Sequence, residues 1–141
     1  MRVISILLLL MLVLPIGSQG VNRSVRIDID EIRKDEYIQG TVTGLTTAGA
    51  SAYKVVVYVK TDVWYIHPLA EGGAGESWAP IGPNGSWKIS TERREVPASR
   101  IAALLVEKDA EVPSKVSNIQ KIPHQAIVIH ELKGTPDYGK L

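Results

Sequence analysis

The chain of 141 residues contains no cysteine and no phenylalanine, and both of its methionines, Met1 and Met11, lie in the first 20 residues. Without cysteine, disulfide bonds, thiol catalysis and a lipid anchor on an N-terminal cysteine are excluded. Any folded core must therefore be built from Val, Ile, Leu and Ala, together with the three Trp and five Tyr residues.

Strongly basic segments are also lacking. Arg2 is the one charged residue among the first 20, so the rest of the chain has one basic residue fewer than the 16 of the whole and balances its 15 acidic residues. Proteins that bind nucleic acid present clustered Lys and Arg. The short pair Arg93 and Arg94 is flanked by Glu92 and Glu95, and we therefore expect no nucleic-acid partner.

The first 20 residues have the pattern of a secretory signal peptide. Arg2 provides the positive start, Val3–Leu14 is almost unbroken aliphatic sequence, and Ser18 and Gly20 are small residues suited to cleavage before Val21. The apolar run is shorter than the roughly 20 residues that span a bilayer. We expect a secreted protein, periplasmic or extracellular, with no membrane span after cleavage; an uncleaved anchor is the alternative.

The remaining chain has the length of one domain. About 120 residues bury roughly two-thirds of their unfolded surface on folding, without disulfide bonds. We expect the domain to span residues 21–133 and residues 134–141 to form a flexible tail.

The stretch Tyr53–Pro68 is the richest in β-branched and aromatic residues and is predicted to be the central strand. Val55, Val57 and Val59 alternate with Lys54 and other residues, which is the period of a half-buried strand with its odd positions facing the core. If the strand continued without a bulge, Trp64 would share the opposite face with Tyr58.

Further strands are expected on both sides of this one. Their short separations indicate an all-β, antiparallel, immunoglobulin-like sandwich of about seven or eight strands, since repeated βαβ units need intervening helices. The run Ile101–Val106 is apolar throughout and is predicted to be buried on both faces, and Trp87 is predicted to face the core. The other expected strands are Val25–Ile32, Tyr37–Gly44, Trp78–Ile81, Ser86–Thr91 and Gln125–Leu132.

Aromatic residues gather around the end of the central stretch. Trp64, Tyr65 and Trp78 flank a Gly-rich segment, and such rings stack on flat carbohydrate or peptide ligands. Asp62 and His67 are the polar neighbours that would orient a ligand. The sequence leaves open whether Trp64 and Tyr65 serve this surface or fill the core, as the central tryptophan of immunoglobulin-like domains does.

Signals for catalysis or metal binding are weak. A nucleophile elbow needs Gly-x-Ser-x-Gly between a strand and a helix, and the sequence around Ser77 matches it only in part. Asp62 with Glu71 or Glu76 is the candidate carboxylate pair. The three histidines lack metal-ligand spacing. We therefore expect a non-catalytic protein with no cofactor and no metal.

Three segments together carry a family resemblance: Val55–Pro68, Asn84–Trp87 with the preceding Ile81, and Ala102–Val106. They resemble small immunoglobulin-like or carbohydrate-binding-like modules that accompany secreted bacterial polysaccharide-active enzymes and cell-surface proteins. The resemblance runs from about Ile38 to Val106. It implies a sandwich without catalysis, and we expect a monomeric or weakly associating module that recognises polysaccharide through the surface aromatic residues. The alternative is a structural or protein-interaction domain of the cell envelope.

Overall fold

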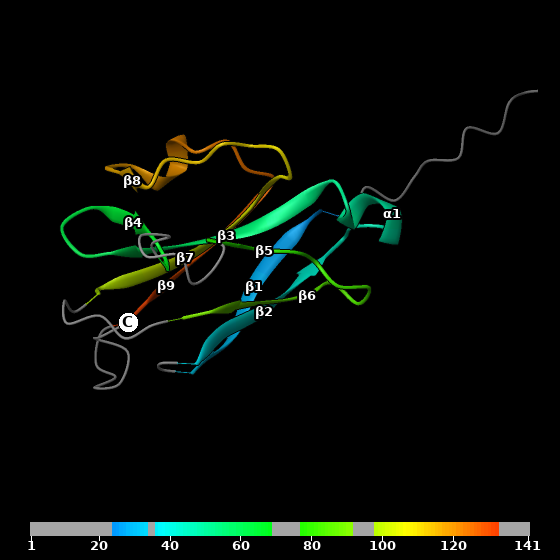
Figure 1. Ribbon diagram of the computed structural model, residues 1–141, viewed down its shortest axis with the longest axis horizontal. Coiled ribbons are helices and arrows are strands. Elements are labelled where there is room, and N and C mark those ends of the chain that lie inside the picture. Colours follow the sequence, from blue (N-terminus) through cyan, green and yellow to red (C-terminus); the bar gives the residue numbers. More distant parts are fainter. Residues whose placement is uncertain (1–23, 34–35, 69–76, 92–97, 133–141) are drawn as a thin grey trace, which may run out of the picture.

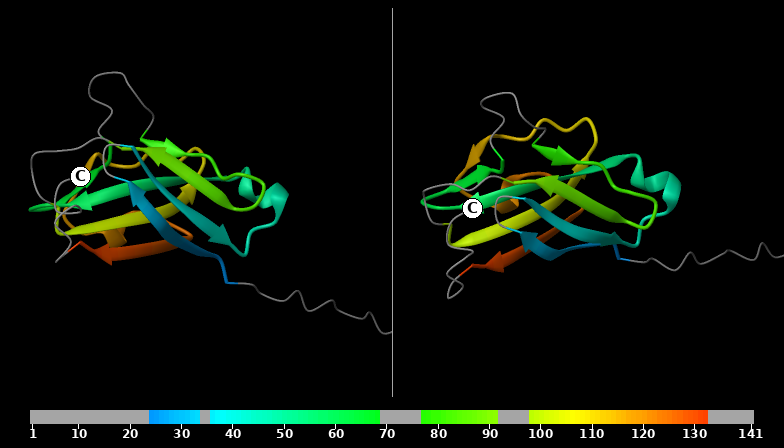
Figure 2. Two further views of the ribbon diagram at one scale, coloured as in Figure 1. Left: turned by 90° about the horizontal axis from the view of Figure 1, so that it is seen from below. Right: turned by 60° about the horizontal axis from the view of Figure 1, so that its bottom comes forward.

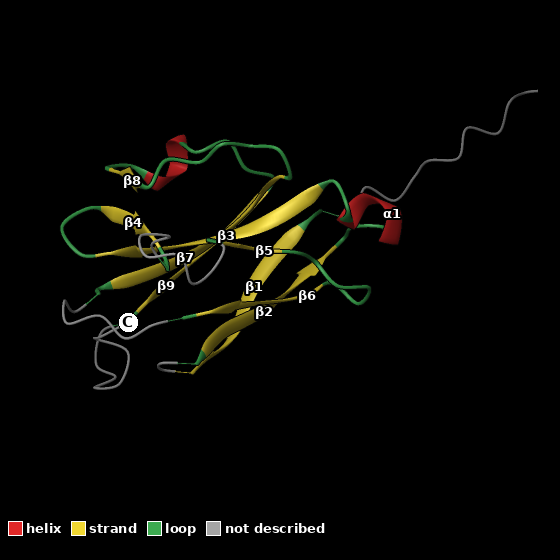
Figure 3. Cartoon of the chain, in the orientation of Figure 1, coloured by secondary structure: helices red, strands yellow, loops and turns green. Residues whose placement is uncertain are grey.

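The computed structural model describes residues 24–33, 36–68, 77–91 and 98–132. These residues form nine strands and two single-turn helices (Figures 1 and 3). The elements in chain order are β1 (Arg26–Arg33), β2 (Tyr37–Thr43), α1 (Thr47–Ala50), β3 (Tyr53–Lys60), β4 (Trp64–Ile66), β5 (Trp78–Ala79), β6 (Ser86–Ser90), β7 (Arg100–Glu107), β8 (Lys115–Val116), the 3₁₀ helix η1 (Ile119–Lys121) and β9 (Ala126–Glu131).

Two antiparallel sheets pack face to face, as the two views of Figure 2 show. The smaller sheet has the order β1-β2-β6, and the larger has the order β8-β4-β3-β7-β9. Strands β4 and β5 pair with the same edge of β3 at different ends, through Tyr58 to Lys60 and through Val55 and Val56 respectively. The all-β, two-sheet expectation is confirmed, and two of the nine strands have only two residues.

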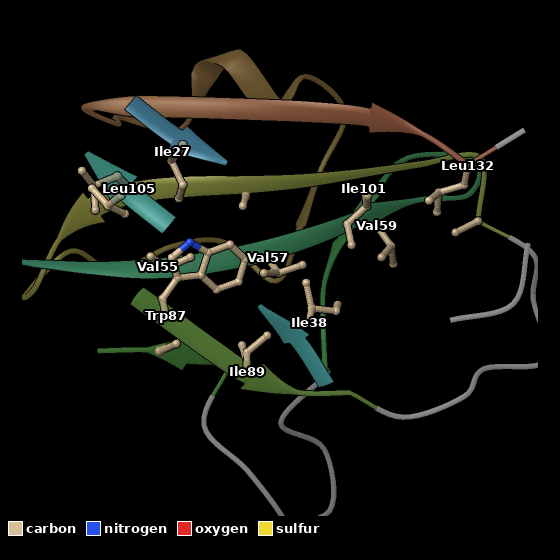
Figure 4. Packing of buried hydrophobic residues seen from close by; sticks show 14 residues of the cluster. Ile27, Ile38, Val55, Val57, Val59, Trp87, Ile89, Ile101, Leu105 and Leu132 are labelled. Atoms are coloured by element: carbon tan, nitrogen blue, oxygen red, sulfur yellow. The ribbon is translucent and has the colours of Figure 1, made fainter. Parts of the chain in front are cut away.

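The core between the sheets follows the alternation of the central strand. Val55, Val57 and Val59 of β3 point into it, as predicted, and meet Trp87 and Ile89 of the smaller sheet (Figure 4). Trp87 is only 2% exposed, so its predicted core position is confirmed. Small aliphatic side chains fill most of the remaining space, which is what a chain without phenylalanine must use.

The opposite face of the larger sheet has a second core, of which the sequence predicted only the part formed by β7. Tyr58 and Trp64 pack there with the even-numbered side chains of β7. The segment Ala110–Gln125 covers this face and supplies Ile119 and Ile122. Strand β7 is buried on both faces because each of its faces lies against one of the two cores, as its unbroken apolar sequence predicted.

The covering segment is tied to the sheet by polar contacts as well. The hydroxyl of Tyr58 donates to the carbonyl of Pro113 at 2.6 Å, and Lys54 Nζ donates to the carbonyl of Ala110 at 2.9 Å. Strand β8 adds a short ladder to β4. We call Ala110–Gln125 the strap.

The predicted central stretch is a hairpin instead of one long strand. Thr61–Val63 form a turn, in which the Thr61 N–H donates to the Val63 carbonyl at 3.0 Å, and β4 returns beside β3. The pairing of Tyr58 with Ile66 places Trp64 on the face of Tyr58.

The predicted signal peptide, the tail over 134–141 and residues Glu71 and Glu76 lie outside the described residues. Within the described part of the chain, no helix is long and apolar enough to cross a membrane.

Candidate functional site

Two of the five predicted ligand contacts are buried. Trp64 is 4% exposed and lies in the second core beneath the strap, and His67 is 2% exposed. Neither side chain offers a face to a ligand in solution, and of the two positions that the sequence left open for Trp64 the structure has the core position. Trp64 is buried because the strap covers the face of the sheet that carries it.

His67 connects the two sheets. It follows β4, and its backbone N–H donates to the carbonyl of Val57 at 2.8 Å. Its imidazole Nε2 is hydrogen-bonded to the hydroxyl of Thr91, which directly follows β6. Thr91 is also buried. A buried polar pair of this kind stabilises the packing of the sheets, and it explains the position of His67 without a ligand.

Tyr65 and Asp62 lie together at the β3–β4 turn. Tyr65 is half-buried, and Lys115 Nζ lies 5.4 Å from the centre of its ring. The carboxylate of Asp62 is exposed and accepts a hydrogen bond from Thr61 Oγ1 at 2.9 Å. This bond lowers the pKa of Asp62, with a smaller contribution from the Tyr65 hydroxyl. The turn therefore carries one aromatic ring with an ionised carboxylate beside it.

Trp78 lies on the other face of the larger sheet. It pairs with Val56 on the strap side, whereas Tyr65 pairs with Val59 on the side of the inter-sheet core. The ring is half-buried, packs against the second core and has Lys54 Nζ 6.0 Å from its centre. The structure thus brings Tyr65 and Asp62 together but does not bring Trp78 to the same surface.

A polar surface that the sequence reading missed lies on the outer face of the smaller sheet. Inward side chains of β2 and β6 enter the core, so the alternate positions face solvent. Cross-strand pairing sets Tyr37 opposite Ser90, Gln39 opposite Lys88 and Thr41 opposite Ser86. We call this the polar sheet face; it comprises Asp30, Glu31, Arg33, Tyr37, Gln39, Thr41, Ser86 and Lys88.

Glu31 is the centre of a hydrogen-bond network on this face. Its carboxylate accepts from Arg33 Nε at 2.8 Å, from Gln39 Nε2 at 2.9 Å and from the Tyr37 hydroxyl at 3.2 Å. The hydrogen bond from Arg33 is the main cause that holds the pKa of Glu31 below its ordinary value. A bulge in β1 between Ile29 and Glu31 helps to direct this side chain toward β2.

Cations lie close to the Tyr37 ring. Lys88 Nζ is 3.8 Å from the ring centre and the Arg33 guanidinium carbon is 5.7 Å from it. The negative face of an aromatic ring attracts such groups. The Lys88 ammonium therefore lies over Tyr37, on the same face of β2 as Gln39, the cross-strand partner of Lys88.

A hollow of about 490 Å³ opens on the polar sheet face at the β6 edge. Most of its side chains are hydrogen-bond donors and acceptors, including Gln39, Thr41 and Lys88. Thr41 Oγ1 donates to Asp30 Oδ2 at 2.6 Å, so this wall is ordered before any ligand arrives. The remaining lining residues are Gly40, Pro80, Gly82, Ser86 and Trp87.

The alternation of polar residues in the segments Tyr37–Gly44 and Ser86–Thr91 was the available signal for this face. Each segment alone predicts a solvated strand face. The two rows form one surface only because β2 pairs with β6, and these two strands are far apart in the sequence.

No group of three or more His, Asp or Glu side chains that could hold a metal ion occurs among the described residues. Comparisons with protein-family models, curated proteins and solved structures found no match for the chain. The class that its fold defines is an all-β protein of two packed antiparallel sheets.

Proposed function

We propose that the chain is a secreted, non-catalytic binding module that recognises carbohydrate, with the hollow on the polar sheet face as the contact surface. The observation that carries the proposal is the composition of this hollow, whose walls present amide, hydroxyl, carboxylate and ammonium groups from adjacent strands. Sugar hydroxyls pair with such groups, and a small number of fixed polar contacts orients a ligand. The immunoglobulin-like and carbohydrate-binding-like resemblance of Val55–Pro68 supports the same class of function.

The ligand would lie across β2 and β6. Gln39 and Lys88 are cross-strand partners at the centre of the face, so both reach one sugar unit. Gln39 is already aligned by its bond to Glu31, which reduces the entropy lost on binding. Trp87 lies in the floor of the hollow, so its fluorescence is a natural reporter.

Titration of the purified protein with soluble neutral polysaccharides, followed by tryptophan fluorescence and calorimetry, tests the proposal. Loss of one ligand hydrogen bond costs about 1 kcal/mol, or about fivefold in affinity, and we expect at least this loss for Gln39→Ala and for Lys88→Ala. Tyr65→Ala, at the β3–β4 turn, is the matched control and should bind as the wild type does. No response to any glycan, or equal binding by all three variants, would reject the proposal.

A structural or protein-interaction domain is the second candidate. It is favoured by the burial of Trp64 and Trp87, because these indoles act in packing instead of offering rings to a sugar. In that case no polysaccharide gives a response in the titration.

A further inference from the structure

In the part of the chain that the structure describes, strand β9 lies at one edge of the larger sheet. It is the last strand in the order β8-β4-β3-β7-β9, and its only ladder partner among the described strands is β7. Its side chains Ile127 and Val128 are half-buried and Ile129 is 38% exposed. Among the described residues, Ile129 is the one large hydrophobic side chain that is exposed.

The other edges have features that discourage pairing with a further strand. Strand β1 has a bulge between Ile29 and Glu31 and charged side chains at alternate positions. Strand β6 has Lys88 at its centre, and β8 has only two residues. Charges, bulges and shortness are the usual protection of sheet edges. Strand β9 has none of these over Ala126–Ile129.

The ladder with β7 defines which backbone groups of β9 point outward. Leu132 N–H donates to the carbonyl of Ser99 at 2.9 Å, and this hydrogen bond has the same register as the pairing of Ile101 with His130. Hydrogen-bonding direction alternates along an antiparallel strand. Val128 and His130 therefore bond to β7, while Ile127, Ile129 and Glu131 direct their N–H and C=O groups away from the sheet.

We propose that this edge pairs with β9 of a second copy of the chain, antiparallel about a two-fold axis, to form a weak dimer with one continuous sheet. Residues whose backbone N–H and C=O groups point outward must pair with residues of the same kind in the second copy. This condition leaves few possible registers. In the register centred on Val128, Ile127 of each copy lies opposite Ile129 of the other. In the register centred on Ile129, Ile127 would lie opposite Glu131.

The register centred on Val128 is favoured by its side chains. It forms two apolar cross-strand pairs, which stabilise antiparallel ladders, and covers the exposed Ile129 side chain. It also separates the two Glu131 carboxylates, each of which stays beside Arg100 of its own chain at 3.2 Å. The contact involves only one short strand from each copy, which is smaller than the interfaces of stable dimers. The dimer should therefore form only at high concentration.

This inference concerns the larger sheet and is independent of the carbohydrate proposal, which concerns the smaller one. Sedimentation velocity of the purified protein over a range of about 10 μM to 1 mM should give a sedimentation coefficient that rises with concentration. Ile129→Lys places an ammonium beside Ile127 of the second copy and should weaken the dimer at least tenfold. Thr43→Lys adds the same charge at an exposed position of β2 and should leave the dimer unchanged.

Cross-linking tests the register, and the absence of native cysteine makes single-cysteine variants unambiguous. Directly paired residues have the Cα separation that a disulfide requires, whereas diagonal neighbours do not. A mixture of Ile127→Cys and Ile129→Cys should oxidise to the mixed dimer faster than either variant alone. A protein that stays monomeric at every concentration, a dimer unaffected by Ile129→Lys, or preferential linking of Ile129→Cys to itself would overturn the proposal.

Discussion

Gly40 of β2 and Trp87 of β6 are cross-strand partners, and the indole of Trp87 occupies the space beside Gly40 where other residues carry a side chain. A Cβ on Gly40 would lie 2.6 Å from Trp87 Cζ2 and 1.9 Å from the backbone carbonyl oxygen of Asp28. One wall of this space is backbone, which cannot rotate away. The pair therefore depends on glycine at position 40.

Gly40→Ala should destabilise the protein by about 3 kcal/mol or more, since overpacking against backbone exceeds the usual cost of an added methyl group. Urea unfolding followed by tryptophan fluorescence measures the change. Gly49→Ala is the control, because a Cβ there meets only the Thr46 hydroxyl, at 3.0 Å, and its effect should stay within about 1 kcal/mol. Equal stability of the two variants would contradict the packing described for Trp87.

Trp64→Ala should destabilise the fold by about 3 to 5 kcal/mol, the usual cost of removing a buried large side chain. The indole packs in the second core against Tyr58 and the strap residues Ile119 and Ile122, so its removal leaves a cavity there. Tyr65→Ala, one residue along the same strand but half-buried, should cost clearly less. Chemical denaturation of both variants decides the matter, and a wild-type midpoint for Trp64→Ala would show that the strap leaves Trp64 open.

Tyr58 should make stability depend on alkaline pH. Burial raises its pKa to about 12, whereas a tyrosine in the unfolded chain titrates near 10. The unfolded state therefore loses this proton first. The contribution of Tyr58 is fully present below about pH 10 and is lost as the pH rises toward 12.

Stability measured by denaturation between pH 9 and 12 should fall less steeply for Tyr58→Phe than for the wild type. The same variant loses the hydrogen bond to Pro113, at a cost of about 1 kcal/mol at neutral pH. Tyr53→Phe is the control, since Tyr53 is only half-buried at the start of the same strand. Identical slopes for the wild type and Tyr58→Phe would mean that the Tyr58 hydroxyl reaches solvent.

Glu31 should titrate below the ordinary range of a glutamate because Arg33 donates a hydrogen bond to its carboxylate. Carboxyl chemical shifts recorded by NMR over acidic pH give its pKa directly. Arg33→Gln should raise this pKa toward the ordinary value, whereas Arg26→Gln, an exposed change on the same strand, should not alter it. A Glu31 pKa insensitive to Arg33→Gln would mean that the network on the polar sheet face is not formed in solution.

The strands that could be predicted best are those in which the sequence pattern alone shows which face is buried. The alternation of Val55, Val57 and Val59 identified the inward face of β3, and the unbroken apolar run of β7 identified a strand with a core on each side. The core position of Trp87 was predicted from the same alternation of inward and outward side chains along its strand. These features depend on the period of two along a strand, which is local.

The positions of Trp64 and His67 could not be read in this way. Trp64 has the parity of Tyr58, as anticipated, but its exposure depends on the strap, which begins more than forty residues later in the chain. His67 finds Thr91 across the two sheets. A local pattern states which face a side chain is on, and it does not state what covers that face.

The sequence by itself therefore determined the strand period, the antiparallel all-β class and the aliphatic nature of the core, because these depend on neighbouring residues and on composition. The tertiary structure alone decided which aromatic rings are sealed, which polar rows meet on β2 and β6, and which edge remains open. Those outcomes depend on contacts between segments distant in the chain, for which a single sequence carries no local signal.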